Sequence, residues 1–263
     1  MPGVNTVVLA IPLGIAIGLV VGTVGGGGAI LALPVLVYVL GEEIGPATTA
    51  SLVVVAIAAA VGAGGLALRG HVCWRIALTF TAPAAAGSVV GTLANTTVSA
   101  KALILSFVPI LVVAAAATWQ RAAQTSSNET GACPPARPVR IVIAGTGVGA
   151  LTGFFGVGGG FLIVPVLTSW LGFSFRRAVA TSLVIITLTG LAALTSHLAL
   201  GASIDVPLTA ALSASTAAGA LIGSIFAQRV PQAALGRAFA VIVVLLAAFL
   251  LVDTLLLGGP PQG

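Results

Sequence analysis

The stretch GTVGGGGAILALPVL, residues 22–36, recurs later in the chain as GFFGVGGGFLIVPVL, residues 153–167. Each copy contains a run of glycines followed by a short apolar segment with a proline. Glycine in a helix costs about 1 kcal/mol per residue relative to alanine, so each run is expected to interrupt a helix. The pair therefore predicts two broken helices, one in each half of the chain.

The composition around these two stretches is that of a membrane protein. Of 263 residues, 59% are hydrophobic and only 6% are charged, whereas about 25% of residues are charged in a typical soluble domain. Six apolar runs approach the length of about 20 residues that a spanning helix needs: 48–68, 74–94, 102–119, 178–200, 205–226 and 236–257. Four further runs are shorter or adjoin the glycines: 4–24, 29–40, 139–156 and 161–172. We predict an all-α, polytopic membrane protein of eight to ten helices, in contact with the lipid bilayer.

The similarity between the two halves extends beyond the glycines. When 14–53 is compared with 145–184, 16 of 40 positions are identical, against about 4 or 5 expected by chance for this composition. The polar segment 120–138 lies at the midpoint and resembles a solvated linker. The sequence thus predicts a first repeat at 1–119, a linker at 120–138 and a second repeat at 139–263.

The positions of the charged residues predict how the repeats are oriented. If each broken element enters the membrane and returns to the same side, each half has three helices that cross the membrane. Because three is an odd number, the second repeat is inverted relative to the first. One face then carries nine basic residues: Arg69, Arg75, Arg121, Arg137, Arg140, Arg176, Arg177, Arg229 and Arg237. The other face carries Lys101, Glu42, Glu43 and Asp205. A single crossing by the broken elements would instead divide the basic loops between the faces. The positive-inside rule therefore favours inverted repeats with a cytoplasmic linker.

The glycine breaks are the candidate binding site. Unwound backbone inside a bilayer is tolerated only within protein or along a cavity. The helix that restarts after each break presents free N–H groups and the positive end of its dipole, which suits an anion. The candidate substrate-binding residues are the backbone of Gly25, Gly26, Gly27, Gly28, Gly156, Gly158, Gly159 and Gly160, and the hydroxyls of Thr49, Ser51, Thr181 and Ser182. The alternatives are glycines that only permit packing, and hydroxyls that cap or bond to helix backbone.

The other special residues suggest structural roles. Gly14, Gly18 and Gly22, like Gly87 and Gly91, follow the small-xxx-small spacing of packed membrane helices. Neither glycine run is followed by Gly-Lys-Ser/Thr, so a phosphate-binding loop is excluded. The set of tryptophans at run ends reads as interfacial anchors: Trp74, Trp119 and Trp170. His197 and Asp253 read as interfacial, with proton relay as the alternative.

Several classes of function are not expected. Cys73 and Cys133 have no CxxC partner or metal-ligand spacing, so free thiols are expected. We find no catalytic constellation, and therefore expect neither an enzyme nor a metal or other cofactor. The net charge of +5 comes from scattered single residues without interleaved aromatics, so a nucleic-acid partner is not expected.

The duplicated motif resembles the sulfite exporter TauE/SafE family of membrane permeases. The resemblance rests on Gly25-x-Gly27-Gly28 with the following Leu33-Pro34-x-Leu36, on the echo at 156–167, and on Ala180-Thr181-Ser182-Leu183. It implies transport of sulfur-containing anions, such as sulfite or organosulfonates, across the prokaryotic plasma membrane.

These observations lead to one functional expectation with two alternatives. We expect a secondary transporter that moves a small inorganic or organic anion by alternating access, with a proton or sodium ion as possible coupling ion. A passive anion channel and a non-transporting membrane assembly factor are the alternatives.

Overall fold

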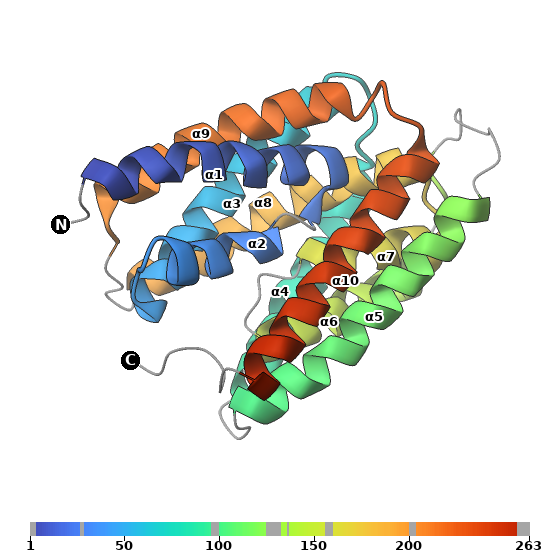
Figure 1. The fold of residues 1–263 in the computed structure, drawn as a ribbon. Helices are drawn as coiled ribbons and strands as arrows, with labels where there is room; N and C mark the ends of the chain where they lie inside the picture. Colours follow the sequence, from blue (N-terminus) through green and yellow to red (C-terminus); the bar gives the residue numbers. More distant parts are fainter. Residues whose placement is uncertain are drawn as a thin grey trace.

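Helices account for all the regular structure of the described residues. The computed structural model describes residues 4–26, 29–95, 100–124, 133–135, 137–155, 160–199 and 204–256. Its helices are α1 (Val4–Val24), α2 (Ala29–Pro34), η2 (Val35–Val39), α3 (Ile44–Ala67), α4 (Trp74–Asn95), α5 (Ala100–Gln124), α6 (Pro138–Phe155), α7 (Gly160–Ser169), α8 (Phe175–Ala199), α9 (Val206–Phe226) and α10 (Gln232–Leu256) (Figure 1). The all-α prediction is confirmed.

Seven of the described helices are long and apolar enough to cross a membrane. They are α3, α4, α5, α6, α8, α9 and α10. Large apolar side chains such as Val90 and Leu245 are about two-thirds exposed, at 64% and 65%. Such a surface is stable against lipid and not against water. The chain is therefore a multi-pass membrane protein, as the composition predicted.

The linker between the halves is shorter than predicted. Residues 120–124 were assigned to the linker, but they continue helix α5 as far as Gln124. Arg121 lies in this last turn, where a positive charge favours the helix dipole. The polar residues 120–124 form the last part of α5, where the helix extends beyond its apolar region.

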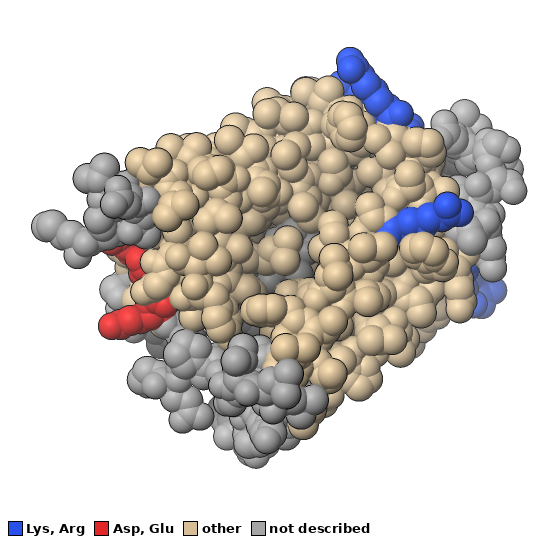
Figure 2. Space-filling view, in the orientation of Figure 1, with Lys and Arg blue, Asp and Glu red and all other residues tan. Residues whose placement is uncertain are grey.

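The two broken elements open toward opposite ends of the molecule. α1 begins at the end that carries Glu42 and Glu43, and the chain returns to that end after η2 (Figures 1 and 2). α6 begins beside Arg140, and α7 ends where the Ser169 carbonyl oxygen accepts a hydrogen bond of 2.8 Å from Arg121. Each broken element therefore returns to the end from which it came.

Charges are separated along the long axis of the molecule. Figure 2 shows arginines gathered at one end and acidic residues at the opposite end. At the acidic end, burial raises the pKa of Glu42 above its ordinary value, and the negative charges of Asp205 and Glu43 raise it further. This separation agrees with the distribution of charges that the inverted-repeat arrangement predicted; the cytoplasmic location of the arginine-rich end stays a prediction of the positive-inside rule.

Close glycine contacts join a helix of each half to a helix of the other. α1 packs along α9, and α4 packs along α6. A methyl group added at Gly18 would overlap the carbonyl oxygen of Thr216, and one added at Gly87 would overlap that of Thr146. These backbones approach as closely as small-residue spacing allows, so the packing interpretation of Gly14, Gly18, Gly22, Gly87 and Gly91 is confirmed.

Two neighbouring glycines of α6 offer a test of this packing. A methyl group at Gly149 would overlap the Ala84 carbonyl oxygen, whereas one at Gly147 would meet nothing within 4 Å. Gly149→Ala is expected to lower stability by about 1–3 kcal/mol, because overpacking forces the helices apart. Gly147→Ala is expected to be neutral or slightly stabilising, since alanine favours helix. Thermal melting of both variants in detergent measures the difference, and equal melting temperatures would contradict the packing assignment.

Candidate functional site

The two glycine breaks meet each other in the interior. A methyl group added at Gly26 would overlap the backbone of Gly160, and one added at Gly160 would lie 2.9 Å from the Cα atom of Gly26. Gly26 follows the end of α1, and Gly160 begins α7. Stretches far apart in the sequence are thus in direct backbone contact. Gly27, Gly28, Gly156, Gly158 and Gly159 lie outside the described residues.

Gly25 fixes how the chain leaves α1. Its φ angle is +79°, a conformation in the left-handed region that glycine adopts without strain. A methyl group at this position would lie 2.9 Å from the Ser182 hydroxyl oxygen and 3.4 Å from the Cα atom of Val179. The first break therefore lies directly against helix α8, beside one of the predicted hydroxyls.

The four candidate hydroxyls have different surroundings. Thr49, Thr181 and Ser182 are buried, at 1%, 0% and 0% exposure, and Ser51 is partly buried. Ser182 donates to the Val179 carbonyl oxygen at 2.9 Å, and Ser51 donates to that of Thr48 at 2.8 Å. Of the four, Ser182 is the one that the described contacts place against a glycine break.

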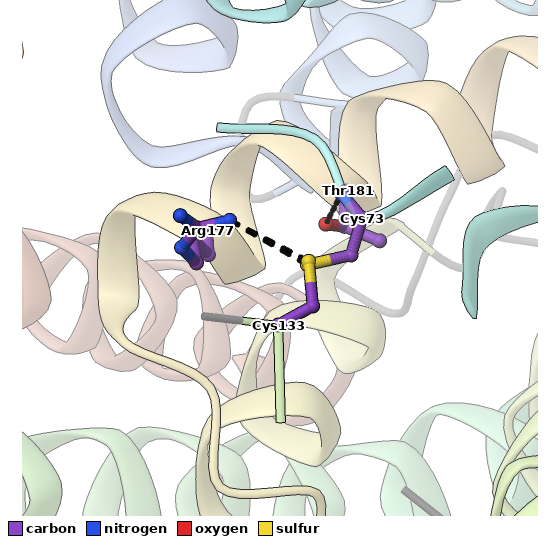
Figure 3. Close-up of a disulfide and its surroundings, with 4 residues drawn as sticks. All are labelled: Cys73, Cys133, Arg177 and Thr181. Carbon is purple, nitrogen blue, oxygen red and sulfur yellow. Dashed lines mark hydrogen bonds between the residues drawn. A yellow bond between two sulfur atoms is a disulfide. The ribbon is translucent and has the colours of Figure 1, made fainter. Parts of the chain in front are cut away.

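Thr181 lies beside a disulfide, which corrects the prediction of free thiols. Cys73 and Cys133 are joined, with their Cα atoms 5.9 Å apart (Figure 3). The Cys73 N–H donates to the Thr181 hydroxyl oxygen at 3.2 Å. The Arg177 guanidinium lies 3.5 Å from the Cys133 sulfur and 3.9 Å from the Cys73 sulfur. The two cysteines are 60 residues apart in sequence, and the fold, not their spacing, brings them together.

A small cavity with mostly apolar walls and a few polar side chains lies between the arginine-rich end and the first break. Its volume is about 10 Å³, which is room for about one water molecule. Its lining residues come from four helices (α1, α3, α8 and α10) and two loops: Gly22, Thr23, Leu66, His71, Phe175, Arg176, Val179, Ala227, Gln228 and Leu235. Val179 also contacts Gly25, so the cavity and the break share a wall.

Two buried nitrogens of this cavity have no hydrogen-bond partner among the described residues. They are Nδ1 of His71 and Nε of Arg176. Arg176 also donates through Nη2 to the carbonyl oxygens of Gln228 and Val230, at 3.0 and 3.1 Å. Arg69 donates to the side-chain oxygen of Gln228. Buried polar atoms without partners are costly, so a water or an anion oxygen is the natural occupant.

No sequence pattern predicts a site that contains His71, Arg176 or Gln228. Each lies near a helix end, and no motif connects them. The one available signal was that Arg176 and Arg177 are adjacent immediately after the second broken element.

The electrostatic environment of His71 makes its protonation unfavourable. Burial lowers the pKa of His71 below its ordinary value of 6.5, and the positive charges of Arg177, Arg176 and Arg69 lower it further. The folded protein therefore resists taking up a proton that the unfolded chain accepts as the pH falls below about 6.5.

A pH-dependent loss of stability follows from this pKa. Stability is expected to decrease between pH 7.5 and pH 5.5 more in the natural protein than in His71→Gln, which has no imidazole to protonate. Melting temperatures of the two proteins across this range measure the effect. Identical losses would show that His71 is protonated as easily in the folded protein as in the unfolded chain.

A second depression is too apolar for an anion. It has a volume of about 380 Å³ and lies between the α2–η2 segment and α10. Its walls are aliphatic and aromatic: Leu31, Pro34, Val35, Tyr38, Val39, Ile242, Leu245, Leu246 and Phe249. An anion would lose its hydration there without gaining comparable donors.

Comparisons with known proteins agree with this architecture. Residues 10–250 match the family model described as "Sulfite exporter TauE/SafE". A "Probable membrane transporter protein" of Xylella fastidiosa strain 9a5c is 30% identical over 258 residues, covering 94% of this chain and 96% of the relative. A protein with the same description from strain Temecula1 is 33% identical over 196 residues, covering 72% of each chain. No solved structure shows significant similarity to the chain.

Proposed function

Because this chain belongs to the sulfite exporter TauE/SafE family, we propose that it is a secondary transporter that moves a small anion across the prokaryotic plasma membrane. The proposed cargo is a sulfur oxyanion or organosulfonate such as sulfite. The observation that carries the proposal is the direct contact of the two glycine breaks around Gly26 and Gly160. Broken helices that meet in the interior are typical of transporter binding sites.

The anion is held by backbone N–H groups of the breaks, assisted by hydroxyls. The proposed groups are the N–H groups of Gly26–Gly28, Gly156 and Gly158–Gly160, and the hydroxyls of Thr49, Ser51, Thr181 and Ser182. The predicted role of the Gly25 N–H is corrected: it donates to the Val21 carbonyl oxygen at 2.8 Å, so Gly25 shapes the break and does not bind the anion. Ser182 contributes most among the hydroxyls, because its oxygen lies against Gly25. Neutral donors suit a transporter, because an anion must also be able to leave its site.

Alternating access follows from two inverted repeats, 1–119 and 139–263. Three features support the inversion: the opposite openings of the two broken elements, the separation of charges, and the pairing of α1 with α9 and of α4 with α6. Each of these pairs combines a helix of one repeat with a helix of the other and is fixed by glycine contacts. The pairs therefore move as rigid units, and their relative tilt exposes the breaks to one face and then to the other.

The His71–Arg176 cavity is the proposed passage between the breaks and the cytoplasm. Arg69, Arg176 and Arg177 attract an anion to this end, and the unpartnered Arg176 Nε can donate to one of its oxygens. With room for about one water molecule, the passage is closed in this conformation. Opening it requires separation of Arg176 from the loop between α9 and α10, which carries Gln228 and Val230.

Flux measurements in proteoliposomes test the function. Sulfite, thiosulfate, sulfate and a sulfonate are compared, each with and without a proton or sodium gradient. Saturable flux of one sulfur anion that a gradient accelerates is the expected result. Non-saturable flux indifferent to both gradients would instead indicate a passive channel, and no flux of any anion would indicate an assembly factor.

A further inference from the structure

The Cys73–Cys133 disulfide lies at the arginine-rich end of the molecule. Arg177 contacts both sulfurs, and Arg176 is its neighbour on α8 (Figure 3). The positive-inside rule places this end in the cytoplasm, where thiols are kept reduced and lasting disulfides are rare. A bond that opens and closes fits this location, whereas a permanent structural bond does not.

The different exposure of the two sulfurs determines which of them an incoming thiolate attacks. Cys133 is exposed, whereas Cys73 is 3% exposed. An incoming thiolate therefore attacks the Cys133 sulfur, the S–S bond breaks, and Cys73 leaves as a thiolate. The Arg177 guanidinium, 3.9 Å from the Cys73 sulfur, stabilises that thiolate, because a nearby positive charge lowers a thiol pKa. It lies closer to the Cys133 sulfur, at 3.5 Å, so the difference in exposure, and not Arg177, sets which sulfur is attacked.

A dithiol reductant completes the reaction. Its second thiolate attacks the reductant's own sulfur in the mixed disulfide, which forms the reductant's internal S–S bond and releases Cys133 as a thiolate. Two electrons pass from the reductant to the protein pair, and two protons distribute over the released thiolates according to pH. Oxidation reverses these steps with a disulfide oxidant of the same class.

The disulfide is connected to the cavity through the loop at 68–73. This loop carries Arg69, which bonds to Gln228, and His71, which lines the cavity. It ends at Cys73, whose N–H bonds to Thr181 on α8. The closed disulfide ties this loop to the segment that precedes α6, so one wall of the cavity is held in place.

From these contacts we infer that Cys73 and Cys133 form a thiol–disulfide switch that locks the cytoplasmic passage when oxidised and releases it when reduced. The inference rests on the proposed function for its effect on flux. Its chemistry and its effect on the loop at 68–73 do not depend on which anion is carried.

The first experiment measures the thiols in cells and needs no transport. Growing cells are quenched in acid, and free thiols are labelled with a maleimide–polymer conjugate that shifts the protein on a gel. Both cysteines are expected to label in untreated cells, and neither after brief treatment with diamide. A bond that stays closed in untreated cells, and opens to a membrane-impermeant reductant added outside, would overturn the switch and place the arginine-rich end outside.

The second experiment measures the effect on the loop. Hydrogen–deuterium exchange of residues 68–73 is compared in the oxidised and dithiothreitol-reduced natural protein and in Cys133→Ser. Cys133 is substituted, not Cys73, because Cys133 is exposed and its loss leaves the buried Cys73 in place. Faster exchange is expected in the reduced protein and in Cys133→Ser under both conditions, and unchanged exchange would overturn the inference.

Flux in proteoliposomes gives the functional readout. The cargo is sulfate or a sulfonate, because sulfite itself cleaves disulfides. Reduction is expected to raise flux by about fivefold or more, the lower end of usual coupling between sites, and Cys133→Ser is expected to match the reduced protein throughout. Equal flux from the oxidised and reduced protein would overturn the lock. If neither the oxidised, the reduced nor the Cys133→Ser protein transports the anion, but hydrogen–deuterium exchange of residues 68–73 still differs between the oxidised and reduced proteins, the proposed transport is contradicted and the switch is supported.

Discussion

Gly26→Ala is expected to reduce anion flux by at least about tenfold while the protein still inserts in the membrane. The backbone at Gly26 does not have a positive φ, so alanine brings no conformational strain there. Its methyl group, however, would overlap Gly160 and force the two breaks apart. Overpacking costs about 1–3 kcal/mol, and a displaced break loses the alignment of its N–H groups, so flux is expected to fall by at least about tenfold.

Two further alanine variants make this a graded series. A methyl group at Gly160 would lie 2.9 Å from the Gly26 Cα atom, a less severe contact, so a smaller loss of flux is expected. A methyl group at Gly64 in α3 would meet nothing within 4 Å, so Gly64→Ala should transport normally. Flux in proteoliposomes is measured beside size-exclusion profiles in detergent, which report folding. Full activity of well-folded Gly26→Ala would remove the glycine contact from the mechanism.

Arg176→Gln is expected to weaken uptake of the anion from the arginine-rich side by about tenfold to a hundredfold. A hydrogen bond to a charged group contributes about 1.5–3 kcal/mol. Arg176 lines the cavity, and its buried Nε has no hydrogen-bond partner among the described residues. The loss should appear mainly as a higher KM, because the passage and not the central site has changed. Arg176→Lys retains the charge and is expected to recover part of the affinity.

The control for Arg176 is an arginine at the same end that does not line the cavity. Arg140 is exposed in the first turn of α6. Arg140→Gln removes one charge from the same face and should change KM by less than about twofold, since exposed charges are screened by salt. If both variants behaved alike, the effect would be one of general surface charge. If neither changed KM, the cavity would not be the passage.

The fold was largely predictable from the sequence because lipid imposes simple rules. A run of apolar residues at 4–24 had to become one helix, and it did so with the expected bounds. The glycines at every fourth position predicted close helix packing, and Gly18 and Gly149 lie at such contacts. In both cases, residues that are close together in the sequence are sufficient to predict the structure.

The site was less predictable because its contacts join distant parts of the chain. The glycine runs indicated two breaks, but only the folded chain brings Gly26 against Gly160. The partner of Cys73 could not be identified from spacing alone. The role of Arg176 depends on carbonyl groups of the loop between α9 and α10, more than 50 residues away, and no sequence pattern predicts such a contact.

The pairing of α1 with α9 has a consequence for biosynthesis. α1 leaves the ribosome before α9, which follows only after residues 25–205 have been made. Until then, the glycine face around Gly18 has no partner and lies open to lipid or to the insertion machinery. Chains that stop before residue 206 should therefore be recognised by membrane quality control and degraded. The same dependence means that the two halves, synthesised as separate polypeptides, should each be short-lived alone and should survive when produced together.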